Sequence, residues 1–594
     1  MTNIIFLILL RLKTASIPEI FYKLKEFFYL LIIYIRTNIS FDYSNEVWNN
    51  LNNLRLPQFN RSSNTPSKDG WTITPRQLQA IRDFEASQGK KFFWTVKIPA
   101  GFDIRAAWEL ARLQHLSAHW LRTGEPESTA IDVGQLTAGR EPLFAWLQHN
   151  PFPLGPHYRS AMECGLRLPV FFYALKLLDQ LNDTEKQQLL TAIYQHAWLI
   201  AHRLSLYSSC GNHTVCEALG LVFAGAIFGA TAQGKKWLHT GIRLLEQELN
   251  RQVLSDGGPL EQAIKYHRFV LDAYWLVFDF LTKNGLYDCR GWLDRLRLGE
   301  QFLQAFSYAP GKLLAIGDSD DGHIVAPGIG PAREPAPPPR WSLKTFPEAG
   351  YTVIRGHDDL ILTFDHGPLG MPPLYAHGHA DALAITLSLL GKTILVDPGT
   401  YRYNGVPAWR RYFKSTRAHN TVTVDGQDQA VQETSFIWSH PYKATLLTAQ
   451  ETADGILLAG QHNGYAGLRA PVYHQRRIFF SQERYCLIHD TFQGEGEHTF
   501  ELNYHLHPRA VVQPCQQGWE VRLDDVKVYI RLWAAANFRL ACGEEQPPLG
   551  WYAPVYGQKV ASSVLSCRQQ GKPVEVSFLT GIYPMPSAPR SSSF

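Results

Sequence analysis

The sequence predicts an α+β fold in which a helical domain precedes an antiparallel β domain, and three observations lead to this prediction. Apolar residues recur at helical spacing through much of residues 76–306. A proline-rich segment at residues 326–340, APGIGPAREPAPPPR, then cannot continue a helix. Beyond it, short β-branched or aromatic runs are separated by turn residues. Helices followed by strands, rather than alternating with them, indicate the α+β class.

Size and composition describe a folded globular protein with room for more than one domain. At 594 residues the chain exceeds a single ordinary core, which predicts two large domains plus smaller segments. Hydrophobic residues make up 45% and charged residues 19%, so the composition excludes a disordered chain. Aromatic residues reach 12%, with 16 Trp and 26 Tyr, a content that suits large cores and also suits stacking against sugar rings.

Charge and cysteine content narrow the partners and cofactors. The formal net charge is +4, and no block of Lys or Arg resembles a nucleic-acid patch, so we expect no nucleic-acid partner. A weak positive field favours anionic substrates without identifying any of them. Eight cysteines form no CxxC pair, which argues against a thiolate zinc site and against a dense disulfide framework. The cysteines do not show whether the protein works in an oxidising or a reducing compartment.

The N-terminal segment, residues 1–75, is predicted to be a helical arm. Residues 4–10 and 27–35 are apolar, but neither stretch reaches the roughly 20 residues that a spanning helix needs, and no A-x-A cleavage site follows. The arm could pack on the helical domain, or it could lie on a membrane as an interfacial helix and give peripheral membrane contact. We favour packing, because five aromatic residues resemble a face for burial against protein: Phe21, Tyr22, Phe27, Phe28 and Tyr29. A basic, apolar arm without a cleavage site favours the cell envelope or periplasm over the alternative, the cytoplasm.

Residues 76–325 are predicted to form the helical domain. Helical spacing is clearest at residues 189–204, 235–254 and 270–281. Short polar turns between such segments indicate packed helical hairpins, although a helical solenoid gives a similar pattern.

The β domain is predicted at residues 344–585, after a Pro-rich linker at 326–343 and before a frayed tail at 586–594. Glycines such as Gly391 and Gly426 separate many of its short apolar runs. This pattern is typical of an antiparallel β-sandwich or a stack of sheets. The expected strands are residues 360–365, 382–390, 393–397, 421–425 and 477–480.

Five clusters of polar residues carry the candidate chemistry, and they fall in both domains. In the helical domain, GNHTVCEA at 211–218 begins a helix with Asn212 and His213, and DGGPLEQAIKYHRF at 256–269 places Tyr266 near a loop-to-helix junction. Taken singly, Asn212 could be a helix cap and Tyr266 a core residue. The remaining clusters are GDSDDG at 317–322, YAHGHADALA at 375–384, and VDPGTYRY at 396–403 with RAHNTVTVDG at 417–426.

The sequence His377-Gly378-His379 is the sharpest of these features. In an extended segment residues i and i+2 share a face, and the intervening glycine permits close backbone approach, so both imidazoles could point into one site. Asp397 and His419 follow in neighbouring strand-like segments, which makes a His/Asp/His metal site reasonable. The alternative is that both histidines are ordinary polar residues at a strand end.

Together these motifs resemble the heparinase II/III family of polysaccharide lyases, which is related to several alginate lyase families. The most specific parts are HGHADALAITLSLLGKTILVDPGTYRY and WRRYFKSTRAHNTVTVDGQDQ, which look like the signature of the family's C-terminal β domain. NHTVCEALGL, DGGPLEQAIKYHRF and GDSDDG look like its helical motifs. The resemblance runs over most of the chain, from Trp94 to Pro584. It implies an incomplete α/α toroid followed by an antiparallel β-sandwich domain, with substrate held in the cleft between them.

The resemblance also implies roles for individual residues. The asparagine neutralises the substrate carboxylate with the first histidine beside it, while the tyrosine and the second histidine are the catalytic pair. These four positions are Asn212, His213, Tyr266 and His377. Some members of the family carry a zinc site, and at the matching positions of this chain we expect one structural zinc ion. Its three matching positions are His379, Asp397 and His419.

The expected activity is β-elimination at C4–C5 of an acidic polysaccharide that contains uronic acid. The C5 proton is only weakly acidic beside a charged carboxylate, so donors that hold that charge stabilise the transition state. A base must then take the C5 proton and an acid must protonate the departing O4. Whether Tyr266 or His377 is the base depends on syn or anti elimination, which the sequence leaves open.

Two other functions stay open. A glycoside hydrolase would need two carboxylates, for which Glu261, Asp318 and Asp381 are available. A non-catalytic glycan-binding or polysaccharide-assembly protein could keep the same fold. The chain also departs from the family, because residues 262–265 read QAIK where Ser and Pro are expected more often. In addition, the N-terminal arm resembles those of relatives associated with making cell-surface polysaccharide.

Overall fold

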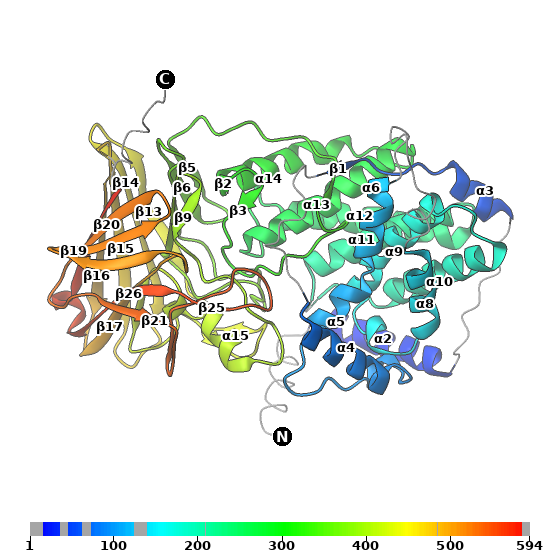
Figure 1. Cartoon of the computed structure of the whole chain (residues 1–594), viewed down its shortest axis with the longest axis horizontal. Coiled ribbons are helices and arrows are strands. Elements are labelled where there is room, and N and C mark those ends of the chain that lie inside the picture. Colours follow the sequence, from blue (N-terminus) through cyan, green and yellow to red (C-terminus); the bar gives the residue numbers. More distant parts are fainter. Residues whose placement is uncertain are drawn as a thin grey trace.

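The computed structural model describes residues 16–35, 45–61, 73–123, 139–207, 209–483 and 485–584. Figure 1 shows helices gathered at one end of the molecule and strands at the other, with the sheet of β5, β6 and β9 facing the helices. The apolar stretch at residues 4–10 and the predicted tail at 586–594 lie outside the described residues.

The helical part precedes the strands in the chain, as predicted. The predicted helices at 189–204, 235–254 and 270–281 are present and somewhat longer or shifted by a few residues. In Figure 1 the helices of this part are coloured from blue to green along the chain. The described helices are α2 (Ile17–Ile35), α3 (Asn45–Asn53), α4 (Pro75–Gln88), α5 (Ile104–Ala111), α6 (Gln114–Thr123), α8 (Arg140–His149), α9 (Ala161–Leu177), α10 (Asp183–His202), α11 (Asn212–Ile227), α12 (Ala232–Gln252), α13 (Ile264–Lys283) and α14 (Leu293–Ala305).

Helix α11 lies at the centre of this part. Its residues from Thr214 to Ile227 are buried, and it packs against α9, α12 and α13. A helix that is apolar on every side can be stable only when neighbours surround it. Its first turn, which carries Asn212, is thereby held at a fixed place at one end of the helical part.

The strands of the described residues form three larger antiparallel sheets, and one apolar cluster contains side chains from all three. This arrangement confirms the predicted β domain of stacked antiparallel sheets. The first sheet is β5 (Leu343–Phe346), β6 (Tyr351–Arg355), β7 (Ile361–Asp365), β8 (Ile385–Leu389) and β9 (Lys392–Leu395). The second is β13 (Ala444–Glu451), β14 (Gly455–Tyr465), β15 (Val472–Ser481), β16 (Cys486–Gly494), β27 (Ser577–Pro584), β20 (Val526–Trp533), β19 (Gly518–Leu523) and β18 (Val511–Cys515). The third is β10 (Val422–Val424), β17 (His498–His505), β26 (Ser563–Gly571) and β21 (Arg539–Cys542).

The Pro-rich segment between the two parts contains a short strand. Strand β4 (Ile329–Pro331) pairs antiparallel with β1 (Phe59–Arg61), and Phe59 lies opposite Pro331. Ile329 is buried. The segment therefore connects the two domains and also holds part of the N-terminal segment in place.

Helix α2 packs on the helical domain through one face only. The Tyr22 hydroxyl donates to the Leu204 carbonyl at 2.8 Å, and the ring of Tyr29 lies 4.2 Å from that of His202. The prediction that five aromatic residues form one buried face is wrong for three of them, because the helix turns these onto the opposite side: Phe21, Phe27 and Phe28 are 67%, 63% and 61% exposed. Among the described helices, none combines the length and the apolar character needed to cross a membrane.

Candidate active site

A cavity of about 480 Å³ lies between the helical part and the β domain. Helix α5, the starts of α9 and α13 and the loop before α11 line one side, and the loops after β7 and β9 line the other. The structure therefore brings together the four predicted catalytic residues, which all line this cavity: Asn212, His213, Tyr266 and His377.

Asn212 is fixed at the start of α11 by Glu261. Its backbone N–H and its Nδ2 donate to the two carboxylate oxygens of Glu261, each at 2.8 Å. The preceding Gly211 has φ +104°, and a Cβ there would lie 2.1 Å from Glu261 Oε1. Asn212 is therefore the first helical residue and not the cap. Its Oδ1 is buried and has no hydrogen-bond partner in the described part of the chain, which leaves it available to a ligand.

His377 lies beside Asn212 with its two ring nitrogens in different surroundings. Nδ1 is 3.1 Å from Asp318 Oδ2, and Nε2 is 3.3 Å from Asn212 Nδ2. Since a carboxylate only accepts, we assign the proton to Nδ1, which places the lone pair on Nε2. Burial lowers the pKa of His377, but the Asp318 carboxylate outweighs burial and holds the pKa above its ordinary value.

Tyr266 stacks on His377 and keeps its proton. The hydroxyl donates to Asp320 Oδ2 at 3.1 Å and lies 2.9 Å from the Tyr403 hydroxyl. Burial raises the pKa of Tyr266 well above its ordinary value, and the nearby carboxylates of Asp320 and Asp318 raise it further. The residue is thus a neutral proton donor rather than a phenolate.

Asp318 joins several of these groups. Arg410 binds its carboxylate through both terminal nitrogens, the Nη2 contact being 2.7 Å, and His379 Nε2 contacts Oδ1 at 3.1 Å. The side chain is fully buried, yet Arg410 and the two histidines hold the pKa well below its usual range against the effect of burial. The backbone N–H of Asp318 also donates to the His377 carbonyl at 3.1 Å. One carboxylate therefore positions both histidines of the His-Gly-His segment.

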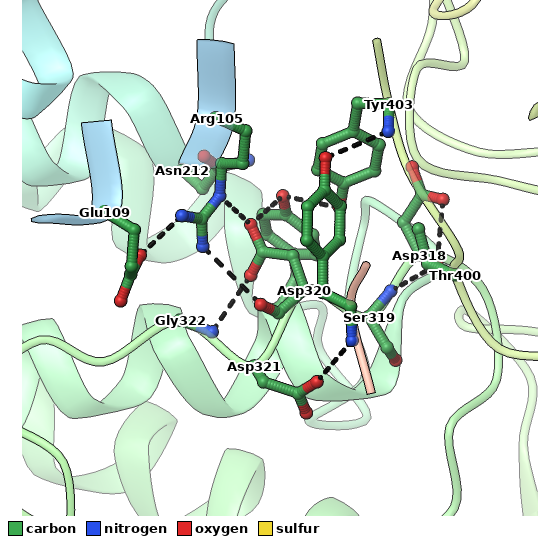
Figure 2. A network of polar contacts seen from close by, with 12 residues as sticks. Arg105, Glu109, Asn212, Asp318, Ser319, Asp320, Asp321, Gly322, Thr400 and Tyr403 are labelled. Carbon is green, nitrogen blue, oxygen red and sulfur yellow. Dashed lines mark hydrogen bonds and ion pairs between the residues drawn. The ribbon is translucent and has the colours of Figure 1, made fainter. Parts of the chain in front are cut away.

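The loop at residues 317–322 carries Asp318 between the two domains. Figure 2 shows that Asp320 accepts a hydrogen bond from Arg105 on one side of this loop, while Asp318 and Ser319 contact Thr400 on the other. Arg105 Nε donates to Asp320 at 3.0 Å, and Ser319 N–H donates to Thr400 Oγ1 at 2.8 Å. Arg105 and Arg112 hold the pKa of Asp320 down to about 2 against the effect of burial.

His213 lines the same cavity as a neutral imidazole. Burial lowers its pKa to about 4, so the ring carries no charge at neutral pH. A neutral imidazole offers a hydrogen-bond donor and an acceptor to a ligand without the cost of burying a charge.

The sequence interpretation considered Asp318 only as a carboxylate for the hydrolase alternative, and it assigned no role to Asp320, Tyr403 or Arg410. All four stand within the quoted motifs, but their contacts join residues that are far apart in the chain. The three acids of GDSDDG were one available signal, because carboxylates gathered in one short loop need cationic partners when they are buried. Their spacing was not a signal, since residues i and i+2 of an extended segment share a face, whereas Asp318 and Asp320 meet partners on opposite sides of the loop.

His379, Asp397 and His419 form a buried group that could hold a metal ion, because their ligand atoms lie within 4.8 Å of one another. His379 Nδ1 lies 3.1 Å from His419 Nε2, and Asp397 Oδ2 lies 3.6 Å from His419 Nε2. His379 Nε2 contacts Asp318, and His419 Nδ1 contacts the Ser415 carbonyl at 2.7 Å.

This donor set fits a cation. If the outer nitrogens of both rings donate to these oxygens, the inner nitrogens face each other with lone pairs, which repel unless a proton or a cation lies between them. Burial also raises the pKa of Asp397 well above its usual range, as expected for a carboxylate without a described cationic partner.

The β-domain glycine between the two histidines is sterically required. A Cβ on Gly378 would lie 1.5 Å from the Leu369 carbonyl oxygen, which no side chain can relieve because the obstacle is backbone. The close approach of Gly378 to the Leu369 carbonyl fixes the backbone between His377 and His379.

Comparisons with known proteins agree with this geometry. Two family models match the chain: the heparinase II/III N-terminus over residues 141–291 and the heparinase II/III-like C-terminal domain over residues 338–579. A heparin-sulfate lyase from Bacteroides stercoris is 22% identical over 405 residues, which cover 63% of this chain and 56% of that protein. A heparin-sulfate lyase from Bacteroides thetaiotaomicron is 20% identical over 540 residues, covering 82% of this chain and 74% of that protein.

Solved structures show the same fold. A crystal structure of heparinase III superposes with a TM-score of 0.65 at 17% identity and covers 90% of this chain and 88% of that one. The heparan sulfate lyase from Pedobacter heparinus gives a TM-score of 0.56 at 18% identity over 90% of this chain and 86% of that one. The two family models together cover more than half of the residues, on both sides of the cavity. The chain belongs to the heparinase II/III family.

Proposed function

We propose that this protein is a polysaccharide lyase that cleaves a uronic-acid-containing acidic polysaccharide by β-elimination across C4 and C5. The observation that carries the proposal is the pairing of a protonated Tyr266 hydroxyl with a His377 imidazole in one cavity, beside Asn212. An elimination needs one proton acceptor, one proton donor and a group that holds the substrate carboxylate, and these three side chains match those needs.

The substrate carboxylate would lie against Asn212 and His213. The second hydrogen of Asn212 Nδ2 faces His377 Nε2 at 3.3 Å, and the substrate carboxylate would share this hydrogen, while the neutral His213 ring offers a further donor. Donors that are already oriented stabilise the enolate-like charge without reorganising during the step. Glu261 serves as the positioning residue, because it holds the Asn212 amide in one orientation.

His377 is suited to take the C5 proton and Tyr266 to protonate O4. The C5–H electron pair forms the C4=C5 double bond, the C4–O4 bond breaks, and O4 takes the Tyr266 proton. His377 Nε2 then holds the C5 proton, which must return to the Tyr266 oxygen before the next turnover. Because the two rings stack, both groups approach from one side, which favours syn elimination. This geometry suits gluco- or manno-configured uronates, in which H5 and O4 share a face.

A zinc ion bound by His379, Asp397 and His419 would act as structural support. Bound there, it would neutralise the buried Asp397 charge and satisfy the facing imidazole nitrogens. His379 shares the Asp318 carboxylate with His377. The three metal-site residues would therefore keep His377 in position and would not contact substrate.

The alternatives have weaker support. Asp318 is bound by Arg410 and two histidines, and Asp381 does not line the large cavity, so neither is placed to serve as a hydrolytic acid or nucleophile. A non-catalytic glycan-binding protein would not need a protonated tyrosine stacked on an imidazole that is oriented by a carboxylate.

The substrate itself is part of the proposal. Both curated relatives cited above are named heparin-sulfate lyases, which supports a glycosaminoglycan. However, the match spans only 56% of the first of them, at 22% identity. Ultraviolet absorbance of an unsaturated uronate product, measured on heparan sulfate, hyaluronan and alginate, tests the proposal. Product from none of these, under conditions where the protein is folded, would contradict it.

We also propose that the protein works at the cell envelope, with helix α2 resting on an anionic lipid surface. Lys23 and Lys25 lie on either side of the exposed apolar stripe of α2, each about 100° from its centre on a helix with 3.6 residues per turn. Lysines at the edges of an apolar stripe suit a lipid surface, because their stems cover apolar area. The charge of Lys25 would reach the headgroups, whereas that of Lys23 turns to Glu26 at 2.8 Å. Seven of the 17 large apolar side chains that are exposed in the described chain form this stripe: Ile17, Ile20, Phe21, Leu24, Phe27, Phe28 and Leu31.

A further inference from the structure

A second cavity of about 200 Å³ lies beside the candidate active site and shares part of its wall. The shared lining residues are Trp108, Ser160, Tyr207, Ser209 and His213. Helix α2, which both family models leave out, supplies another part of the wall through Tyr22, Lys23 and Glu26. A polysaccharide held in the larger cavity could therefore extend past His213 into the smaller one.

The charges around the smaller cavity are mostly positive. Glu26 accepts from Lys23 Nζ at 2.8 Å and from Arg203 Nε at 3.1 Å, so two cations share one carboxylate. Arg159 donates to the Val96 carbonyl at 2.6 Å and has no carboxylate partner in the described part of the chain. Burial and the neighbouring Arg203 lower the pKa of Arg159, as expected where cations gather without enough acids.

The nearest further acid does not cancel this charge. Glu217 is fully buried and accepts from the Ser205 N–H and hydroxyl, each at 2.7 Å. Burial raises the pKa of Glu217 to about 8, so the group is mostly protonated at neutral pH.

The cations of the larger cavity are already neutralised. Arg112 binds both carboxylate oxygens of Glu163 at 2.7 and 2.8 Å, and Arg105 binds Asp320 and Glu109. These pairs can orient a substrate, but they add little attraction for a polyanion. The positive charge that an acidic polysaccharide requires is therefore concentrated in the smaller cavity.

We propose that the smaller cavity is a subsite for a carboxylate or sulfate on a sugar next to the cleaved residue, and that Arg159 and Lys23 bind this anionic group. The proposal rests on the lyase function above. The rings of Tyr22 and Tyr207, whose centroids are 5.5 Å apart, offer apolar faces to the sugar ring. Helix α2 thus completes the substrate cleft, and this gives the packed face of the helix a role in recognition.

The test compares Arg159→Gln with Arg140→Gln, a matched control whose half-buried guanidinium binds Glu185 in the same domain, away from both cavities. Defined oligosaccharides of increasing length serve as substrates, in a non-sulfated hyaluronan series and a sulfated heparan sulfate series. Loss of a charge-assisted contact predicts a KM about tenfold higher for long substrates, with kcat within about twofold and little change for the shortest ones. Lys23→Gln should give a smaller rise in KM for long substrates, because the Lys23 side chain is 51% exposed.

Equilibrium binding of the same oligosaccharides separates this proposal from the lyase function. If the wild type forms no unsaturated product, the lyase function fails, while weaker binding by Arg159→Gln alone still supports the anionic subsite. Equal KM and equal binding for Arg159→Gln and Arg140→Gln would overturn the subsite. If Arg159→Gln binds only the heparan sulfate oligosaccharides more weakly than the wild type does, the bound group is sulfate. If it binds both series more weakly, the bound group is carboxylate.

Discussion

Tyr266 and His377 stack with ring centroids 4.2 Å apart and ring planes inclined by 27°. Tyr266 lies in the first turn of α13, whereas His377 lies in the loop between β7 and β8. The proposed proton donor and the proposed proton acceptor therefore meet only where the helical part and the β domain pack together. Substitutions at that interface should affect the reaction even when they touch neither ring.

Tyr266→Phe should lower kcat by about 100-fold or more, because it removes the proposed proton donor while keeping the stacked ring. Product formation and thermal unfolding should be measured together, and the melting temperature should change little. Tyr274→Phe is the matched control, since this buried hydroxyl on the same helix contacts the Leu245 carbonyl and not the cavity. Retention of more than about a tenth of kcat in Tyr266→Phe would rule out its acid role.

Asn212→Ala should lower kcat by about 100-fold, because the substrate carboxylate loses a fixed donor in the transition state. The helix should survive, since the backbone N–H of residue 212 still donates to Glu261. Asn150→Ala, which removes a side-chain bond to the Trp146 carbonyl in α8, should leave kcat unchanged. Equal effects of the two variants would mean that Asn212 is only structural.

Purified protein should contain about one equivalent of zinc by elemental analysis, and a chelator should lower its melting temperature. His419→Gln should lose the metal, because the variant removes one of three ligand atoms. His366→Gln should keep it, since this buried histidine contacts Thr352 Oγ1 and lies outside the ligand group. Metal-free protein with full stability and activity would refute the site.

Stability should fall on acidification between about pH 6.5 and pH 3, partly because of His267. Burial lowers the pKa of His267 to about 3, so the unfolded chain binds a proton in this range that the folded chain does not. The stabilisation is therefore complete above the pKa that His267 has in the unfolded chain. It is lost as the pH falls towards the pKa that His267 has in the folded chain. One proton corresponds to about 1.4 kcal/mol per pH unit.

Urea unfolding at several pH values tests this dependence. His267→Gln should flatten the slope by about that amount, whereas His149→Gln, at an exposed position in α8, should leave it unchanged. An unaltered slope in His267→Gln would show that other groups account for the acid sensitivity.

The protein should bind vesicles that contain anionic lipid through α2. Leu24→Ser combined with Phe28→Ser should weaken co-sedimentation with vesicles and leave the melting temperature nearly unchanged, because both side chains are 61% exposed. Val574→Ser, at a position 74% exposed in the β domain, is the control. Unchanged vesicle binding in the double variant, or no vesicle binding by the wild type, would exclude a lipid surface as the partner.

The fold could be predicted because its signals are local. Helical spacing at 189–204 and 270–281, and the short apolar run at 360–365, follow from which faces of an element are buried, and neighbouring residues show this directly. The start of α11 at Asn212 was visible for the same reason. The family motifs then identified the cavity-lining residues Tyr266 and His377, although the sequence alone could not show that their rings stack.

The remaining features depend on contacts between distant residues. Nothing near Asp318 in the chain indicates that its carboxylate meets Arg410 and two histidines about 60 to 90 residues away. The error at Phe21, Phe27 and Phe28 had a different origin, because all five aromatic residues were treated as one face. Placing them at about 100° per residue puts these three on one side and Tyr22 and Tyr29 on the other.

The pairing of β1 with β4 bears on the order in which the chain can fold. Ribosomes make Phe59 about 270 residues before Pro331, its partner in the pairing. Until then the strand at residues 59–61 has no edge to join, while the helices in between are already being synthesised and can pack. Closure of β1 onto β4 is therefore a late event, of high sequence separation, that joins the two ends of a helical domain already assembled. The strand at residues 59–61 is then the last part of the N-terminal segment to be fixed, because Tyr22 and Asn50 bond earlier parts of the chain, the carbonyls of Leu204 and Ala226.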